Sequence, residues 1–175
     1  MELLADLLKI LLPAALISYM LFLTVRAFLN KEFERRVLEL RQRNAEIVLP
    51  IRLQAYERII LLLERISPNN LVLRISAERP GLNVAGMHHF LLQEVREEFN
   101  HNLSQQLYMS NEAWAVARNA MEDIIGLVNI SSQNLNPEAP GSELAKALLE
   151  FQSRRSENPA DYALRYIKDE IRSVF

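Results

Sequence analysis

The feature that most constrains this chain is an uncharged, largely apolar run near its start, Ile10 to Val25, between Lys9 and Arg26. As an α-helix, this run is roughly 24 Å long, and the apolar residues next to it bring the length close to the ~30 Å core of a bilayer. The stems of Lys9 and Arg26 can lie along lipid while their charges reach the interface. We therefore predict a transmembrane anchor over residues 1–29.

Two other interpretations of the run are weaker. A cleaved signal peptide needs a basic start and a small-residue cleavage site, but Glu2 and Asp6 precede Lys9 and no A-x-A-like site follows the run. An ordinary core helix is the second alternative, because a run of this length is near the lower limit for spanning. Spanning remains the better prediction.

The distribution of cations predicts how the anchor is oriented. Residues 1–9 contain one cation, whereas residues 26–43 contain Arg26, Lys31, Arg35, Arg36, Arg41 and Arg43. The positive-inside bias then places the N-terminus outside and residues 30–175 in the cytoplasm, on the cytoplasmic (inner) membrane. These cations can also contact anionic headgroups, although the interleaved glutamates are equally typical of a solvated helix face.

Composition excludes several classes of function. A net charge of -2 argues against general nucleic-acid binding, because it supplies no strong field for phosphates. The absence of cysteine removes disulfides, thiol nucleophiles and cysteine-ligated zinc. The four glycines stand singly and form no phosphate-binding loop. The residues after the anchor are numerous enough for one domain with its own core.

A long helical stalk is predicted over residues 30–66. Apolar residues with one asparagine recur at a spacing of four and three, typical of a coiled-coil seam: Phe33, Val37, Leu40, Asn44, Ile47 and Ile51. This seam can serve self-association or can pack against later helices of the same chain. Pro50 is expected to kink or break the helix. The consecutive apolar residues Ile59 to Leu63 predict a fully buried segment.

The remainder of the chain predicts an all-α helical bundle. We interpret Leu71 to Ile75 as an extended connector, since a lone strand would have no partner. Helices are expected at 83–102, capped by Asn83, at 111–134, capped by Ser110, at 142–155, and at 159–174. The faces expected to point inward are Val84, Met87, Leu91, Val95, Phe99 and Leu103; then Trp114, Ala117, Met121, Ile124, Ile125 and Val128; then Tyr162, Tyr166, Ile167, Ile171 and Val174.

The densest polar stretch is residues 97–106. Its candidate site residues are Glu98, Asn100, His101, Asn102, Gln105 and Gln106. Glu98 and His101 share one helix face, as in di-iron bundles, but the chain lacks the second pair that such a centre needs. We interpret the stretch as a hydrogen-bond network that closes one helix, with a partner-contact surface as the alternative. No catalytic residue, cofactor site or metal site is predicted.

Three segments of the chain carry a resemblance: the opening MELLADLLKILLPA, then LPIRLQAYERIILLLERISPNNL from Leu49 to Leu71, and EEFNHNLSQQLYMSNEAW from Glu97 to Trp114. With these segments the chain resembles an uncharacterised family of small single-pass membrane-anchored proteins from Bacteroidota. The resemblance implies a membrane setting and carries over no catalytic residue.

These observations together predict a non-enzymatic, membrane-anchored adaptor or subunit of a membrane-associated assembly. Its expected partners are the lipid bilayer and another protein or a second copy of itself. A homo-oligomeric membrane scaffold is one alternative. A membrane-bound metal-dependent enzyme that uses Glu94, Glu98 and His101 is the other.

Overall fold

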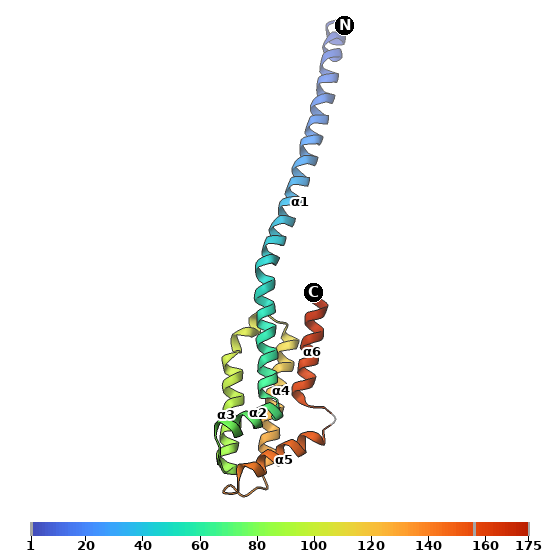
Figure 1. Cartoon of the computed structure of the whole chain (residues 1–175). Coiled ribbons are helices and arrows are strands. Elements are labelled where there is room, and N and C mark those ends of the chain that lie inside the picture. Colours follow the sequence, from blue (N-terminus) through green and yellow to red (C-terminus); the bar gives the residue numbers. More distant parts are fainter. Residues whose placement is uncertain (1, 156, 175) are drawn as a thin grey trace. The chain divides into compact units, whose positions relative to one another are not determined.

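A computed structural model describes residues 2–155 and 157–174, with side chains described from residue 11 to residue 173 apart from residue 156. The helices are α1 (Glu2–Ile66), α2 (Pro68–Glu78), α3 (Val84–His101), the 3₁₀ turn η1 (Leu103–Leu107), α4 (Asn111–Ser132), α5 (Gly141–Ser153) and α6 (Pro159–Val174). Over the described residues there is no strand, and one isolated bridge joins Asn83 to Pro140. The predicted all-α class is confirmed (Figure 1).

The chain divides into two compact units, one up to Leu49 and one from Pro50 onward. The first unit consists of α1 alone, and every side chain from Leu11 to Asn30 is exposed. α1 contains a segment that is long and apolar enough to cross a membrane, judged by length and composition. This agrees with the apolar run that the sequence places before Arg26.

Helix α1 continues without interruption through both of its prolines, Pro13 and Pro50. Of the two expected effects of Pro50, a kink or a break, the break is therefore wrong. Proline removes one backbone donor and costs about 3 kcal/mol inside a helix. The long helical segment before Pro50 and the buried segment after it oppose a break at this single residue, because each turn on either side keeps its own hydrogen bonds.

The last turns of α1 supply the central apolar face of the second unit. Tyr56, Ile59, Leu62, Leu63 and Ile66 are almost fully buried. Leu61, in the middle of the consecutive apolar residues, is 53 % exposed, so the prediction of a wholly buried segment is wrong at this position. Neighbouring helices cover α1 on one side only, and a residue one position before Leu62 points about 100° away from it.

The extended connector expected at Leu71 to Ile75 is also wrong, because these residues belong to helix α2. Pro68 occupies the first turn, where its missing N–H costs nothing. Leu71, Val72 and Ile75 then fall on one face of the helix and are buried. Their spacing is the helical one, and the contact of this face with α3 and α5 stabilises the helix over the extended alternative.

Helices α3 and α4 begin where their predicted caps place them. The Asn83 Oδ1 accepts a hydrogen bond from the Gly86 N–H at 2.9 Å, and the Ser110 Oγ accepts one from the Ala113 N–H at 3.0 Å. The expected inward face of α3 is buried except for Leu103, which lies beyond the helix end in η1 and is 41 % exposed. In α4, Trp114 is half-buried and stacks on Phe99 at 5.2 Å between ring centroids.

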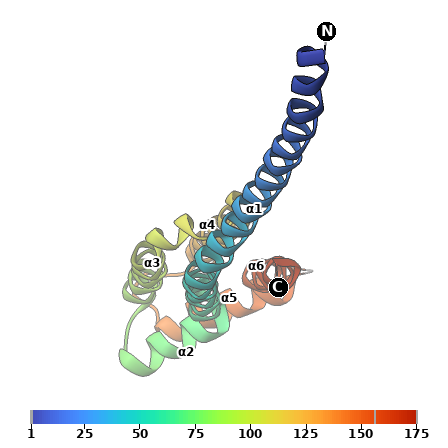
Figure 2. The same cartoon turned by 90° about the horizontal axis from the view of Figure 1, so that it is seen from above.

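Within the second unit, α3, α4, α6 and the end of α1 lie side by side, while α2 and α5 cross one end of this group (Figures 1 and 2). The face of α6 that was predicted to point inward is confirmed at Ile167, which is fully buried, and the half-buried residues of that face pack against the core, but the prediction is wrong at Tyr162. Tyr162 is 49 % exposed, and Tyr166 and Ile171 are half-buried. The expected Val174 side chain lies outside the described residues. The buried residues of α6 are Ala160, Ala163, Leu164 and Ile167.

The starts of α3 and α5 are joined by backbone hydrogen bonds. The Val84 N–H donates to the Ala139 carbonyl at 2.8 Å, and the Gly141 N–H donates to the Leu82 carbonyl at 2.8 Å. A Cβ on Gly141 would lie 2.8 Å from the same Leu82 oxygen, so only glycine allows this close approach. These two backbone hydrogen bonds hold the start of α5 against the start of α3.

Candidate functional site

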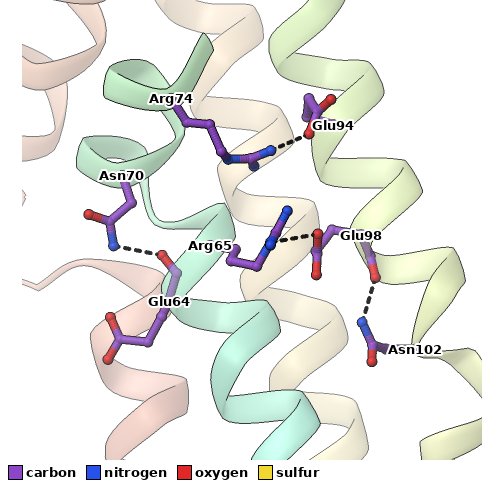
Figure 3. A network of polar contacts seen from close by, with 7 residues as sticks. All are labelled: Glu64, Arg65, Asn70, Arg74, Glu94, Glu98 and Asn102. Atoms are coloured by element: carbon purple, nitrogen blue, oxygen red, sulfur yellow. Dashed lines mark hydrogen bonds and ion pairs between the residues drawn. The ribbon is translucent and has the colours of Figure 1, made fainter. Parts of the chain in front are cut away.

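The polar stretch at the end of α3 meets cations from two other helices (Figure 3). Arg65 of α1 lies with its Nε 2.8 Å from the Glu98 Oε2, and Arg74 of α2 forms an ion pair with Glu94. Glu94 and Glu98 are four residues apart and therefore lie on the same face of α3. We call Arg65, Arg74, Glu94 and Glu98 the ion-pair ladder. It links α1 and α2 to α3.

The two pairs of the ladder differ in their exposure to solvent. The side chain of Arg65 is 53 % exposed and that of Glu98 is 18 % exposed, whereas both members of the Arg74–Glu94 pair are only about a fifth exposed. Solvent screening reduces an exposed pair to about 0–1 kcal/mol. The Arg74 Nη2 is also buried without a hydrogen-bond partner. The inner pair therefore contributes more to the packing of α2 on α3.

A depression of about 400 Å³ lies along this face and is lined by Arg65, Glu94, Glu97, Glu98 and His101. Its lining is charged, and the Glu98 carboxylate that was considered as a metal ligand already pairs with Arg65. Among the residues that the structure describes, no group of three or more histidine, cysteine, aspartate or glutamate side chains is arranged to hold a metal ion. What the structure shows on this face is the two ion pairs of the ladder.

The remaining residues of the stretch separate into buried and exposed members. Asn102 is buried, and its Nδ2 donates to the Glu98 carbonyl at 2.9 Å. Gln105 is also buried, with its Nε2 3.2 Å from the Ser104 Oγ, while the exposed Gln106 donates to the Leu103 carbonyl at 2.9 Å. The bonds from Asn102 and Gln106 satisfy carbonyls at the end of α3 and within η1. Asn100 and His101 are exposed.

A second polar cluster, which sequence reasoning missed, joins α1, α4 and α6. The Tyr56 hydroxyl donates to the Glu170 Oε1, and the Ser110 hydroxyl donates to the Glu170 Oε2 at 2.6 Å. Arg52 donates from its Nε to the Tyr108 carbonyl at 3.1 Å beside this cluster. Burial raises the pKa of Tyr56 above its ordinary value of 10.0, and the hydrogen bond to Glu170 raises it further.

No local pattern in the sequence indicates this second cluster. Tyr56 looks like one more core residue of α1, and Glu170 looks like an exposed charge of an amphipathic helix. The two residues are separated by 114 positions, so their contact depends on how α6 packs. The one local signal was the Ser110 cap, because a capping hydroxyl keeps its own proton free to donate elsewhere.

The predicted seam residues lie on α1 and are largely exposed. Phe33, Leu40, Asn44, Ile47 and Ile51 are exposed and Val37 is half-buried. A groove of about 320 Å³ at the start of the seam is lined by Phe33, Glu34, Val37, Leu38 and Arg41.

The residues predicted to flank the membrane are Arg26, Lys31, Arg35 and Arg36, and all four are exposed. Arg35 pairs with Glu39 at 3.1 Å, and Arg36 pairs with Glu32 at 3.5 Å along the same helix. The side chain of Lys9, the remaining flanking residue, lies outside the described residues.

Residues 2–174 match the model of a protein family described as a family of unknown function, DUF7935. The chain belongs to this family. No curated protein and no solved structure matches it. The matched residues extend from α1 to α6 and include the apolar segment, the seam and the bundle.

The three features differ in how their side chains are engaged. The ion-pair ladder and the Tyr56–Glu170 cluster both connect helices within the second unit, and their polar atoms are largely engaged with one another. The seam presents apolar side chains to solvent over several turns. Of these three features, the seam is the one whose apolar side chains are exposed.

Proposed function

We propose that this family member is a non-enzymatic, single-pass membrane protein whose helical domain serves as an adaptor or subunit of a membrane-associated assembly. The observation that carries the proposal is the exposure of α1. From Leu11 to Leu29 its large apolar side chains are 43–67 % exposed. Exposed apolar surface of this extent is unfavourable in water and is stabilised by transfer to hydrocarbon.

The internal hydrogen bonding of this segment supports placement in lipid. α1 is helical throughout, so its backbone donors and acceptors pair within the helix, as the bilayer core requires. Thr24, one of the few polar residues in the segment, donates its hydroxyl to the Met20 carbonyl at 2.8 Å. A hydroxyl satisfied in this way avoids the cost of an unpaired polar group in hydrocarbon.

The proposed orientation places the N-terminus outside and the helical domain in the cytoplasm, at the cytoplasmic membrane of a bacterium of the Bacteroidota. The cation bias supports this orientation, because Arg26, Lys31, Arg35 and Arg36 follow the apolar segment closely. Their exposure leaves them able to contact anionic headgroups.

The test is gentle extraction of the tagged full-length protein from its native membranes, followed by native mass measurement and identification of co-purifying chains. We expect one foreign chain in a fixed ratio to this protein. A defined multimer of this chain alone would replace the adaptor with the homo-oligomeric scaffold. A monomer that carries no foreign chain would contradict both.

A further inference from the structure

The seam on α1 follows one heptad register. This register assigns each charged residue beside the seam to a heptad position. With Val37, Asn44 and Ile51 at position a, the apolar residues Phe33, Leu40 and Ile47 fall at position d. Phe33 is 70 % exposed, Leu40 is 60 % exposed and Ile47 is 65 % exposed. The exposed a and d residues therefore form an uncovered apolar surface on which one further helix can pack.

The charges beside this seam are predominantly positive. Positions e and g, which flank a coiled-coil interface, are occupied in the central turns by Glu34, Arg36, Arg41 and Arg43. The glutamates that compensate these arginines in the overall charge of the segment stand at position c, on the outer side of the helix: Glu32, Glu39 and Glu46. A helix that docks on the seam therefore meets three arginines and one glutamate.

Ion pairs along α1 do not neutralise these arginines completely. Arg36 has a neighbour in Glu32 at 3.5 Å, but the side chain of Arg36 remains 72 % exposed. Arg41 and Arg43 are exposed and form no ion pair with any residue that the structure describes. The unpaired Arg41 guanidinium therefore lies on one edge of the seam, at position e, and the unpaired Arg43 guanidinium lies on the opposite edge, at position g.

A second copy of the chain fits these charges poorly. Two copies anchored in one membrane have parallel α1 helices, and position g of one then faces position e of the next heptad in the other. Arg36 of each copy would lie against Arg41 of the other, giving two repulsive pairs. Arg43 would meet Val48, and no attractive pair would form at the flanks.

We propose that the seam binds a helix of another protein, with apolar residues at its a and d positions and acidic residues at its e and g positions. This inference rests on the proposed function and names the partner of the adaptor by its chemistry. Carboxylates on the partner pair with Arg36, Arg41 and Arg43, while the partner's polar residue opposite Asn44 sets the register. Charge complementarity selects this occupant over a second copy.

The test uses the full-length protein in phosphatidylcholine nanodiscs and two synthetic helices of about three heptads. Both have apolar a and d positions and one asparagine at an a position, and they differ only in having glutamate or lysine at all e and g positions. We expect the glutamate helix to bind at least about tenfold more tightly by fluorescence anisotropy, since two or three flanking pairs change sign between the peptides.

Variants of the protein locate the binding on the seam. Arg41→Glu/Arg43→Glu should reverse the preference between the two peptides, whereas the control Lys31→Glu/Arg35→Glu alters positions b and f by the same charge and should leave it within about twofold. Leu40→Asp should abolish binding of both helices. Equal binding of the two peptides, or an equal effect of the control, would overturn the proposal.

A separate measurement distinguishes an acidic partner from a second copy, because Arg41→Glu should change the two kinds of association in opposite directions. In a parallel dimer, Arg41→Glu would convert the Arg36–Arg41 repulsion into attraction and strengthen self-association, whereas it should weaken binding of an acidic partner. A native dimer that Arg41→Glu stabilises would overturn the proposal. Native co-purification distinguishes the two claims: a foreign chain that the Arg41→Glu/Arg43→Glu variant retains contradicts the seam proposal alone, and the absence of any foreign chain contradicts the adaptor as well.

Discussion

The Tyr56 hydroxyl on α1 donates a hydrogen bond to the Glu170 carboxylate on α6, across 114 residues of sequence. The same carboxylate accepts a bond from Ser110, whose hydroxyl caps α4. One acidic side chain thus connects three helices of the bundle. Tyr56 is 1 % exposed and Glu170 is half-buried, so these bonds are partly shielded from water, and leaving one of them unmade costs stability.

The first prediction is that Tyr56→Phe destabilises the domain by about 1–2 kcal/mol, because the ring still fills its site while Glu170 loses one donor. Thermal unfolding of the full chain in detergent micelles measures this change. Tyr162→Phe is the matched control, since Tyr162 is half exposed. Equal stability of the two variants would contradict a role for the hydroxyl.

The second prediction concerns pH and the same residue. Because the folded pKa of Tyr56 lies above 10.0, the unfolded chain loses this proton first as pH rises. The stabilisation is therefore complete below about pH 10 and is lost as pH rises from there through the folded pKa. Unfolding free energy measured across this range should fall more steeply for the wild type than for Tyr56→Phe, and parallel curves would refute the assignment.

The third prediction compares two neighbouring leucines of α1. Leu62→Ala should cost about 2–5 kcal/mol, because Leu62 is fully buried and its truncation leaves a cavity. Leu61→Ala makes the same chemical change at a side chain that is 53 % exposed, and it should cost less than about 1 kcal/mol. Denaturant unfolding of both variants measures the difference. Similar losses would mean that α1 buries a different face from the one described.

The fourth prediction ranks the two pairs of the ion-pair ladder. Glu94→Gln should destabilise the domain by about 1–3 kcal/mol, because it leaves Arg74 partly buried and uncompensated. Glu98→Gln should cost about 1 kcal/mol or less, since Arg65 is 53 % exposed and can be solvated. A double-mutant cycle on each pair, repeated at high salt, tests the ranking. The outer pair should show the greater sensitivity to salt, and the reverse order would contradict it.

The fifth prediction tests the orientation in the membrane. The chain contains no cysteine, so a single introduced thiol reports its own position. In intact cells, a membrane-impermeant maleimide should label Glu2→Cys, and it should label Gln133→Cys only after the membrane is opened. Labelling of Gln133→Cys in intact cells would place the domain outside. Replacement of Arg26, Lys31, Arg35 and Arg36 by glutamine should weaken the preference for labelling Glu2→Cys over Gln133→Cys in intact cells.

Local physical chemistry explains which parts of the fold could be predicted. The caps at Asn83 and Ser110 depend on side chains that bond to a backbone N–H three residues later, so sequence alone locates them. The buried face of α3 follows from apolar spacing within that helix. The same reasoning gave a wrong prediction for Leu71 to Ile75, because this segment is short and its helical state depends on contacts with α3 and α5.

The helical class, the apolar segment of α1, and the capped starts of α3 and α4 follow from the sequence alone, because these features depend on side chains within a few residues of one another. Tertiary packing was needed to establish that α2 is a helix, that Tyr162 of α6 is exposed, and that Glu98 meets Arg65 while Glu170 meets Tyr56. These outcomes join residues far apart in the chain. Their free energy comes from packing between helices, which no local pattern of residues encodes.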